Sequence, residues 1–309
     1  MAQLPGVTSY LNIIGTRLRN SNFEFFKRFF RIKRFFVILT SSSVFIALNG
    51  CLKTFFSFYL YDNPPSYSLI LSTFLVIYSV YSINKITDTE EDQLNAPERS
   101  DLISGHDKLF KYTTVSAYAL AVIIGLLYGW QVLLILLFPL LAGVIYSVKL
   151  TPRIPRLKDI FAVKSLVVAL SWTVGNTFLP IVGYNINILV ILLIFYLFFI
   201  KSFINTVLFD LMDVEGDRET GTRTIPVVVG KLHTIKLLLV LNSTLLILVH
   251  ISMVYGLFQI LIIPLIFCII YGYSYILYFS RNKKRLQMDI MVDGEWILIV
   301  FISLLQIKI

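Results

Sequence analysis

The sequence predicts an all-α membrane protein whose chain crosses the bilayer nine times. Hydrophobic residues make up 57% of the 309 residues and charged residues only 15%, and the mean hydropathy is +0.80. Apolar runs close to the length of a bilayer-spanning helix recur along the whole chain. These runs are long and continuous and do not alternate with polar residues, which argues against a membrane β-barrel.

Each predicted span is an apolar run bounded by polar or charged residues. A span needs about 20 residues, because a helix rises about 1.5 Å per residue through a hydrocarbon core about 30 Å thick. The first and sixth spans each contain one lysine, Lys53 and Lys201, and the ninth span is short. The predicted spans are residues 36–60, 67–86, 112–129, 131–148, 160–183, 187–209, 233–255, 257–279 and 294–308.

Residues 1–35 form a separate basic segment before the first span. Residues 22–36 alternate aromatic side chains with lysine and arginine, a pattern typical of a helix at a membrane surface. A plain basic flank in the cytoplasm explains the same residues equally well. Residues 36–309 then make one domain, with two four-helix halves, 36–159 and 160–279, and a ninth helix.

The basic residues predict the orientation of the chain. With the N-terminus in the cytoplasm, 24 of the 27 Lys and Arg residues fall in the N-terminal segment and the inner loops, and the outer turns carry none. This asymmetry is the positive-inside pattern. We therefore expect a multi-pass protein of the cell membrane, with its N-terminus and inner loops in the cytoplasm. The net charge of +9 is then explained by basic residues that face anionic lipid head groups or an anionic substrate, and it does not indicate nucleic-acid binding.

Acidic residues gather at the end of the sixth span. Asp210, Asp213 and Asp217 have i, i+3, i+7 spacing, which places them within roughly 60° of one another on a helix. Carboxylates on one narrow face repel each other, so we expect a cation between them. Oxygen ligands alone favour Mg²⁺ over a softer metal.

A second polar stripe closes the second span. Asn84, Asp88 and Asp92 step by four residues and also share one helix face. The predicted topology places both acidic faces on the cytoplasmic side, four spans apart. Each face is followed by a loop that mixes acids with arginine and lysine, such as Arg99 and Arg223.

Acids beside guanidinium groups favour a site for metal and phosphate together. Mg²⁺ usually takes one or two carboxylates and fills its shell with phosphate oxygens and water, and Arg contacts phosphate through its fork of donors. A diphosphate neutralised in this way becomes a leaving group, and an allylic diphosphate then ionises to a carbocation. Aromatic faces stabilise such a cation, and Tyr81 and Tyr146 are candidates by position. A cation transporter fits less well, because transport sites usually lie near mid-bilayer on interrupted helices.

The two motifs resemble the paired signatures of the UbiA superfamily of intramembrane prenyltransferases. The first motif is Asn84-x3-Asp88-x3-Asp92, and the second is Asp210-x2-Asp213-x3-Asp217. The resemblance extends over about residues 36–309. Further matching residues are Asn95, Pro97, Arg99 and Gly105 after the first motif, Tyr146 and Ser147 with Lys149 nearby, and Gly216, Arg218, Gly221, Thr224, Pro226 and Gly230 in or after the second.

The resemblance implies a nine-helix bundle whose central cavity is capped by cytoplasmic loops. It implies Mg²⁺-dependent transfer of a prenyl group from a prenyl diphosphate to a lipophilic acceptor, in contact with membrane lipids. Two Mg²⁺ clusters are expected. One would be held by Asn84, Asp88 and Asp92, and the other by Asp210, Asp213 and Asp217. Asn84, Arg99, Lys149 and Arg223 would contact the diphosphate.

The sequence departs from the family pattern on the acceptor side. Some members that use a lipid glycerol phosphate have an acidic and a basic residue just before the second motif, where this chain has Thr206 and Phe209. The acceptor therefore stays open. An alternative is a UbiA-type terpene cyclase, in which the cation is captured by double bonds of the prenyl substrate itself and no external acceptor is used.

Overall fold

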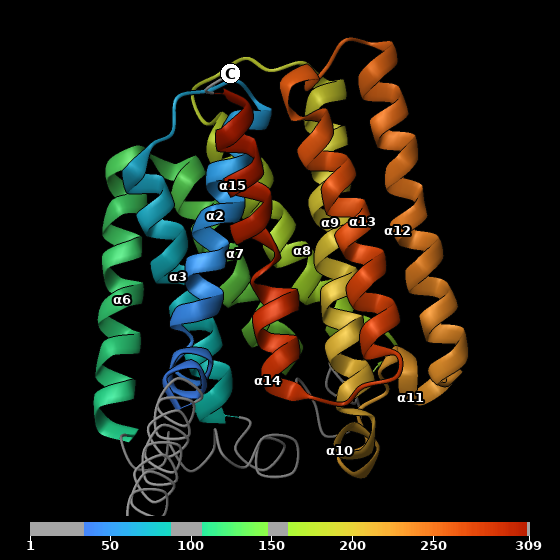
Figure 1. Cartoon of the computed structure of the whole chain (residues 1–309). Coiled ribbons are helices and arrows are strands. Elements are labelled where there is room, and N and C mark those ends of the chain that lie inside the picture. Colours follow the sequence, from blue (N-terminus) through green and yellow to red (C-terminus); the bar gives the residue numbers. More distant parts are fainter. Residues whose placement is uncertain (1–33, 88–106, 148–159, 308–309) are drawn as a thin grey trace, which may run out of the picture.

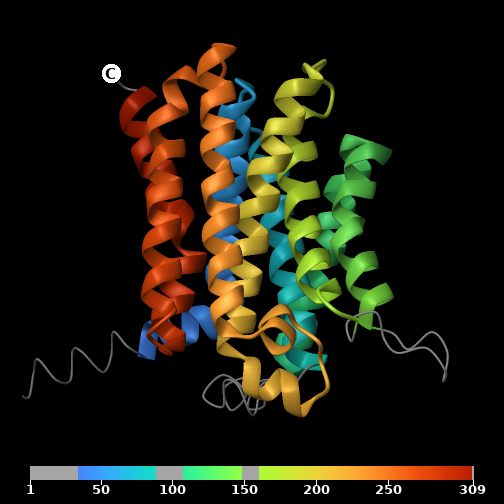
Figure 2. The same cartoon turned by 90° about the vertical axis from the view of Figure 1, so that its right-hand side faces the viewer.

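The computed structural model describes residues 34–87, 107–147 and 160–307. Within these ranges the chain folds into long helices that run side by side and form a bundle (Figures 1 and 2). The end of helix Tyr67–Thr87 that carries Asn84 and the segment that carries Asp210, Asp213 and Asp217 lie toward one end of this bundle, which we call the acidic end. Short helices at the same end connect α9 (Ile188–Met212) to α12 (Lys231–Val254) (Figure 1).

Helices account for all the regular structure of the described residues. A helix at Arg34–Ser41 precedes α2. The elements that follow are α2 (Val44–Leu60), α3 (Tyr67–Thr87), α6 (Asp107–Tyr128), α7 (Trp130–Ser147), α8 (Val163–Phe178), η2 (Leu179–Ile181), α9 (Ile188–Met212), α10 (Val214–Glu219), α11 (Ile225–Val229), α12 (Lys231–Val254), η3 (Gln259–Leu261), α13 (Ile262–Phe279), α14 (Arg285–Met288), the π-helical turn η4 (Asp289–Asp293) and α15 (Glu295–Ile307).

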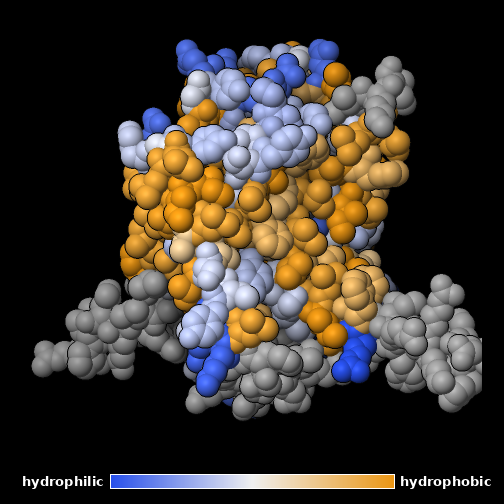
Figure 3. Space-filling model, turned by 90° about the vertical axis from the view of Figure 1, so that its left-hand side faces the viewer, coloured by the Kyte–Doolittle hydropathy of each residue, from blue (hydrophilic) through white to orange (hydrophobic). Residues whose placement is uncertain are grey.

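The described helices fit a lipid bilayer by length and composition. Five are long and apolar enough to cross a membrane, and a sixth span results if the bent pair Arg34–Ser41 and α2 is one crossing. Figure 3 shows hydrophobic side chains in a broad band around mid-height, with hydrophilic side chains toward both ends. Such a band is expected where lipid tails replace water, because apolar side chains then face outward without penalty.

Every predicted span coincides with a helix, but the first one is not straight. The sequence predicts a single helix over 36–60, whereas the chain bends by 67° between Arg34–Ser41 and α2. Lys85 of α3 stabilises the bend, because its ammonium donates to the carbonyl oxygens of Thr40 at 3.1 Å and Ser41 at 2.8 Å. These carbonyls end the short helix and have no partner within it.

The ninth predicted span is also interrupted. The sequence predicts it at 294–308, but the helical stretch begins earlier at Arg285 and passes through a π-helical turn before α15. Gly294 closes that turn, and a Cβ built there would lie 2.1 Å from the carbonyl oxygen of Ile290. A side chain larger than hydrogen does not fit without moving the backbone. π-turns of this kind often mark functional sites.

The core lies where the second half of the chain packs around α9. In this part α8 and α12 pack along α9, and α15 contacts both α2 and α13. The largest fully buried side chains include Trp296, Tyr275 and Phe198. This packing holds the acidic end of α9 beside the neighbouring helices that line the cavity described next.

Candidate functional site

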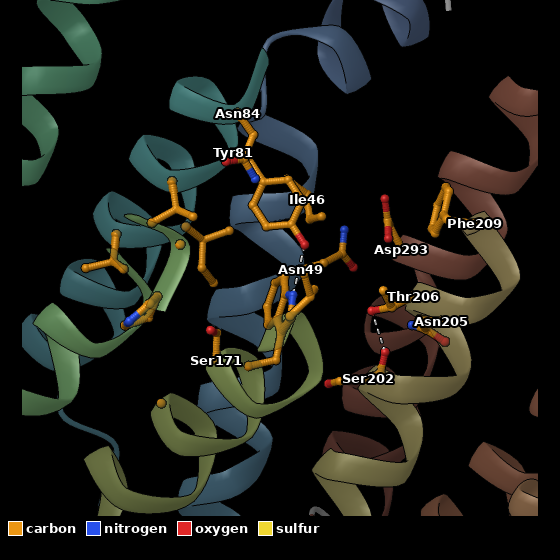
Figure 4. A pocket seen from close by; sticks show the side chains of 18 of the residues that line it. Ile46, Asn49, Tyr81, Asn84, Ser171, Ser202, Asn205, Thr206, Phe209 and Asp293 are labelled. Carbon is orange, nitrogen blue, oxygen red and sulfur yellow. Dashed lines mark hydrogen bonds between the residues drawn. The ribbon is translucent and has the colours of Figure 1, made fainter. Parts of the chain in front are cut away.

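A cavity of about 320 Å³ opens between the helices and reaches the acidic end of the bundle. Its wall is built by α2, α3, α7, α8, α9 and the segment from α14 to η4. The wall is apolar where α3 and α7 face it, through side chains such as Val76, Val80 and Leu136. Polar side chains line the opposite wall, where Figure 4 shows Asn49, Ser202, Thr206 and Asp293, and also line the acidic end.

All three acids of the second motif line this cavity. Asp210 and Asp217 are buried, with 3% and 2% of their surface exposed. The expected continuous helix is interrupted here, because α9 ends at Met212, Asp213 forms its C-cap, and Asp217 belongs to α10. Backbone hydrogen bonds from Asp213 to Phe209 and from Asp217 to Asp213 keep the acids on one side of the chain.

Lys164 joins two of these acids. Its ammonium lies 3.3 Å from a carboxylate oxygen of Asp210 and 3.3 Å from one of Asp217. The hydroxyl of Ser165 also donates to Asp210, at 2.7 Å. The hydroxyl of Thr224 donates to Asp217, at 3.1 Å. The buried charges are therefore balanced by one cation and by hydrogen bonds, as buried carboxylates require.

Burial also changes the acidity of the cluster. Asp217 lies outside the spanning helices, and its burial raises the pKa of this carboxyl to about 6, against the opposing effect of the Lys164 ammonium. The charges of Asp210 and Asp213 raise the pKa of Asp217 further. This mutual repulsion favours binding of a further cation among the acids.

Arg285 brings a second cation to the site from α14. Its guanidinium donates to Asp213 at 2.5 Å and contacts Asp289, one turn further along, at 3.5 Å. Its charge also lies 5.2 Å from the centre of the Phe209 ring. The acidic end therefore combines carboxylates, which bind cations, with Lys164 and Arg285, whose side chains donate to phosphate oxygens.

The first motif is described only in part. Asn84 is half-buried and lines the cavity (Figure 4). Asp88, Asp92, Arg99 and Lys149 lie outside the described residues, as do the N-terminal segment 1–33 and the side chain of Tyr146 in α7. Arg223 is described and exposed, and it is not among the residues that line the cavity.

Tyr81 stands in the wall as half of an aromatic pair. The indole of Trp172 donates to the Tyr81 hydroxyl at 2.9 Å, and the two ring centres lie 6.0 Å apart (Figure 4). Both side chains line the cavity. Aromatic faces in this position offer negative charge density to a cation inside the cavity.

The second motif has the donors for Mg²⁺ but does not form a complete metal site by itself. In the described residues no group of three or more Asp, Glu, His or Cys side chains converges closely enough to hold a metal ion. The carboxylates form ion pairs instead, Asp210 and Asp217 with Lys164, and Asp213 with Arg285. Mg²⁺ fits such a donor set when phosphate oxygens and water complete its shell, which is its usual manner of binding.

Several residues of the site were not predicted from the sequence. Lys164, Trp172, Asp289 and Asp293 line the cavity, together with Arg285. A signal was present for three of them, because Arg285, Asp289 and Asp293 step by four residues, as Asn84, Asp88 and Asp92 do. Lys164 and Trp172 carry no comparable signal, since each is a single residue beside an apolar run.

The fold and the cavity define an all-helical integral membrane protein with an acid-lined site at one end of the bundle. The model of the UbiA prenyltransferase family matches residues 37–292. The chain therefore belongs to the UbiA prenyltransferase family, as the resemblance of its two motifs predicts.

Curated relatives of this chain share one name. Digeranylgeranylglyceryl phosphate synthase of Methanosphaera stadtmanae is 26% identical over 246 residues, which cover 77% of this chain and 87% of the relative. The synthase of the same name from Pyrococcus horikoshii is 28% identical over 177 residues, 55% of this chain and 60% of the relative. This second match thus spans less than two thirds of the relative.

Solved structures share the fold. The apo UbiA homolog of Aeropyrum pernix K1 has a TM-score of 0.64 at 14% identity, with 85% of this chain and 98% of that chain covered. A UbiA homolog of Archaeoglobus fulgidus bound to GPP and Mg²⁺ has a TM-score of 0.61 at 16% identity, with 89% and 99% covered. At these identities the likeness concerns the arrangement of the helices.

Proposed function

We propose that this chain is a Mg²⁺-dependent intramembrane prenyltransferase. In this proposal it moves a prenyl group from a prenyl diphosphate to a lipophilic acceptor through an allylic carbocation. The observation that carries the proposal is the acidic end of the cavity, where Asp210, Asp213 and Asp217 lie beside Lys164 and Arg285. Carboxylates with interleaved cations suit a diphosphate with its metal ions, and the apolar walls suit an isoprenoid chain.

The position of each residue around the cavity suggests its role in the reaction. When bound, Mg²⁺ would neutralise the diphosphate and make it a leaving group. We assign the carboxylates of Asp210, Asp213 and Asp217 to one metal cluster, and Asn84, Asp88 and Asp92 to the other. Lys164 and Arg285 would turn from the acids to the phosphate oxygens, and Arg99, Lys149 and Arg223 would add contacts from the loops.

The cation formed on ionisation would be held by the aromatic wall. The Tyr81 hydroxyl accepts from Trp172, which fixes both rings at the cavity surface. An aromatic face within about 6 Å of a cation stabilises it, and more strongly where water is excluded. Tyr146 is proposed for the same role from α7.

The names of the relatives suggest a class of acceptor to test first. The Methanosphaera and Pyrococcus proteins are named for a digeranylgeranylglyceryl phosphate. A glyceryl phosphate that carries one geranylgeranyl chain is therefore a reasonable acceptor, and geranylgeranyl diphosphate a reasonable donor. The membrane lipids that surround the protein would supply such an acceptor laterally.

We further propose a nine-span topology with the acidic end in the cytoplasm of a cell membrane. The four predicted spans that fall short of the length and hydropathy of the other five, or are bent, all coincide with helices. The basic residues of the inner segments support the orientation, since lysine and arginine accumulate on the cytoplasmic side.

The decisive experiment is an assay of diphosphate release. Purified protein with Mg²⁺ and labelled geranylgeranyl diphosphate is incubated with and without extracted membrane lipids. We expect release with lipids, formation of a labelled lipid, and loss of both when EDTA is added. Release that persists in EDTA contradicts the metal mechanism.

The same assay addresses the cyclase alternative. That alternative is favoured by Thr206 and Phe209, which line the cavity of this chain without a charge. Release without lipids, together with a cyclic hydrocarbon or alcohol, would identify a terpene cyclase on the same scaffold.

A further inference from the structure

Lys53 is a buried cation that faces the cavity with its hydrogen-bond donors unused. It lies in the middle of α2, is 5% exposed, and lines the cavity. In the described part of the chain its ammonium makes no hydrogen bond and no ion pair. It does lie over the Trp172 ring, 4.2 Å from the centre, with the Trp296 ring at 5.6 Å. An ammonium has three donors, and stacking on two rings offsets only part of the cost of its burial.

The buried acid near Lys53 is already neutralised. Glu295 at the start of α15 pairs with Lys201, and both side chains are completely buried. Lys201 also donates to the Tyr275 hydroxyl at 2.8 Å. Glu295 and Lys201 thus form a structural ion pair, and Lys53 is left as the cation that is available to the cavity.

Asp293 provides an unpaired carboxylate in the same cavity. It ends the π-helical turn, is half-buried, and lines the cavity. Within the described residues it accepts no hydrogen bond and makes no ion pair. The turn and Gly294 interrupt the last span at this point. A carboxylate held there without a partner is typical of a functional position.

Other polar atoms on this wall also lack partners. Asn49 of α2 and Ser202 of α9 line the cavity, and the Asn49 amide oxygen and the Ser202 hydroxyl are buried without a hydrogen bond in the described residues. Figure 4 shows Asn49, Ser202 and Asp293 around one part of the cavity. Buried polar groups are normally paired, and these two atoms face a cavity in which a ligand would pair them.

The aromatic side of the cavity is different, because its polar groups are satisfied by the protein. Ser171 donates to the carbonyl of Val167 at 2.8 Å. Asn176 donates to the carbonyl of Trp172 at 2.6 Å and accepts from Thr54 at 3.1 Å. Of these two sides of the cavity, the side formed by α2, α9 and the turn before α15 is therefore the one with unpaired polar groups.

The part of this wall that α9 forms lies away from the acidic end. Ser202 precedes Asp210 by eight residues on α9, which corresponds to about 12 Å along the helix axis. A prenyl diphosphate anchored at the acidic end would extend its allylic carbon into the cavity toward this wall. A second substrate on the wall would then face that carbon.

We infer that the wall with Lys53 and Asp293 is the acceptor site of the proposed prenyltransferase, and that it takes a lipid whose head group carries a hydroxyl close to an anionic oxygen. This inference rests on the proposed function. Lys53 donates hydrogen bonds to the anionic oxygen. Asp293 accepts the proton of the hydroxyl. Asn49 and Ser202 hydrogen-bond the remainder of the head group.

The reaction balances with these two groups. The allylic C–O bond breaks, and its electron pair leaves with the diphosphate. A lone pair of the acceptor hydroxyl oxygen forms the new C–O bond, and the hydroxyl proton passes to the Asp293 carboxylate, which later releases it to water. No oxidant or further co-reactant is needed.

Two variants test the inference, each with a matched control. Lys53→Met and Asp293→Asn remove the charges with little change in size. Lys236→Met and Asp62→Asn make the same chemical changes at exposed positions outside the cavity. Asp62 has φ 54°, a conformation that Asn adopts readily. Each protein is assayed with Mg²⁺ and labelled geranylgeranyl diphosphate, and with lipid extract separated on an anion exchanger into acidic and neutral fractions.

We expect the wild-type protein and both controls to label a lipid of the acidic fraction. In Lys53→Met the apparent KM for that fraction should rise roughly 10- to 100-fold, the effect of losing a hydrogen bond to a charged group. In Asp293→Asn labelled lipid should form at least about 100-fold more slowly, as for loss of a general base. In both variants diphosphate release should continue, and the prenyl cation should be captured by water as prenyl alcohol.

Three results would overturn the inference. Labelling confined to the neutral fraction contradicts an anionic acceptor, and unchanged lipid labelling in both variants contradicts the site. A drop in melting temperature of Lys53→Met with an unchanged KM assigns Lys53 a structural role instead. Failure of the proposed function is distinguishable, because the wild-type protein would then release no diphosphate with either fraction.

Discussion

Lys164 is the residue on which the charge balance of the acidic end depends. It bridges Asp210 and Asp217, both of which are buried. Removal of one partner from a buried ion pair leaves the other charge uncompensated and typically costs about 3–5 kcal/mol. Because Lys164 is 27% exposed, water screens part of this effect, and we expect a loss near the lower end of that range in Lys164→Met.

Mg²⁺ should restore the stability of Lys164→Met. Without the lysine, the carboxylates of the second motif have a greater need for a cation. The melting temperature in detergent should therefore rise more on addition of Mg²⁺ in this variant than in the wild-type protein, by mass action on the folded state. An equal shift in the two proteins, or no shift in either, would argue against a metal site among these acids.

Asp213 is the acid of the second motif for which loss of charge should affect chemistry more than stability. It is partly exposed and pairs with Arg285. We expect Asp213→Asn to slow diphosphate release by more than about 100-fold, because even outer-shell partners of a metal contribute about 10- to 100-fold. Asp62→Asn is the control, and release at the wild-type rate in Asp213→Asn would remove this residue from the metal site.

At the scale of a structural element, the π-helical turn before α15 depends on Gly294. A Cβ at this position would lie 2.1 Å from the Ile290 carbonyl oxygen, so Gly294→Ala must shift the backbone. Overpacking of this kind typically costs about 1–3 kcal/mol. We expect a lower melting temperature and slower lipid labelling, since the turn carries Asp289 and Asp293 into the cavity.

Gly175→Ala provides the matched control for this prediction. Gly175 lies within α8, and a Cβ added there has no atom within 4 Å. Alanine is preferred over glycine inside a helix by about 0.5–1 kcal/mol, so its melting temperature should hold or rise. A Gly294→Ala protein as stable as Gly175→Ala would mean that the turn tolerates a side chain.

At the scale of the whole molecule, the orientation in the membrane can be tested by labelling. Lys283 lies at the acidic end with 59% of its side chain exposed, and Tyr184 lies in the turn between η2 and α9, 48% exposed. In intact cells a membrane-impermeant maleimide should label Tyr184→Cys and spare Lys283→Cys until the cells are opened. The native thiols are protected, since Cys268 is buried and Cys51 half-buried. The reverse pattern would contradict the proposed orientation.

The sequence by itself determined the class of the molecule, its helices and the second acidic motif as part of the cavity. In a membrane, a single long apolar segment pairs all its backbone N–H and C=O groups by forming a helix. Each predicted span does coincide with a helix. The spacing of Asp210, Asp213 and Asp217 also sufficed to predict a shared site, because residues so close in sequence stay together across the break between α9 and α10. The first motif stays a prediction beyond Asn84.

Only the tertiary structure decided which residues from distant helices meet at that site. Lys164, Arg285 and Asp293 come from segments far from the second motif, and packing of the helices, not local spacing, brings them to one cavity. The bend before α2 and the π-turn before α15 likewise depend on contacts with other helices, such as Lys85 with the end of Arg34–Ser41. The local sequence pattern determines which face of a helix is polar, but the packing of the helices determines which other segments contact that face.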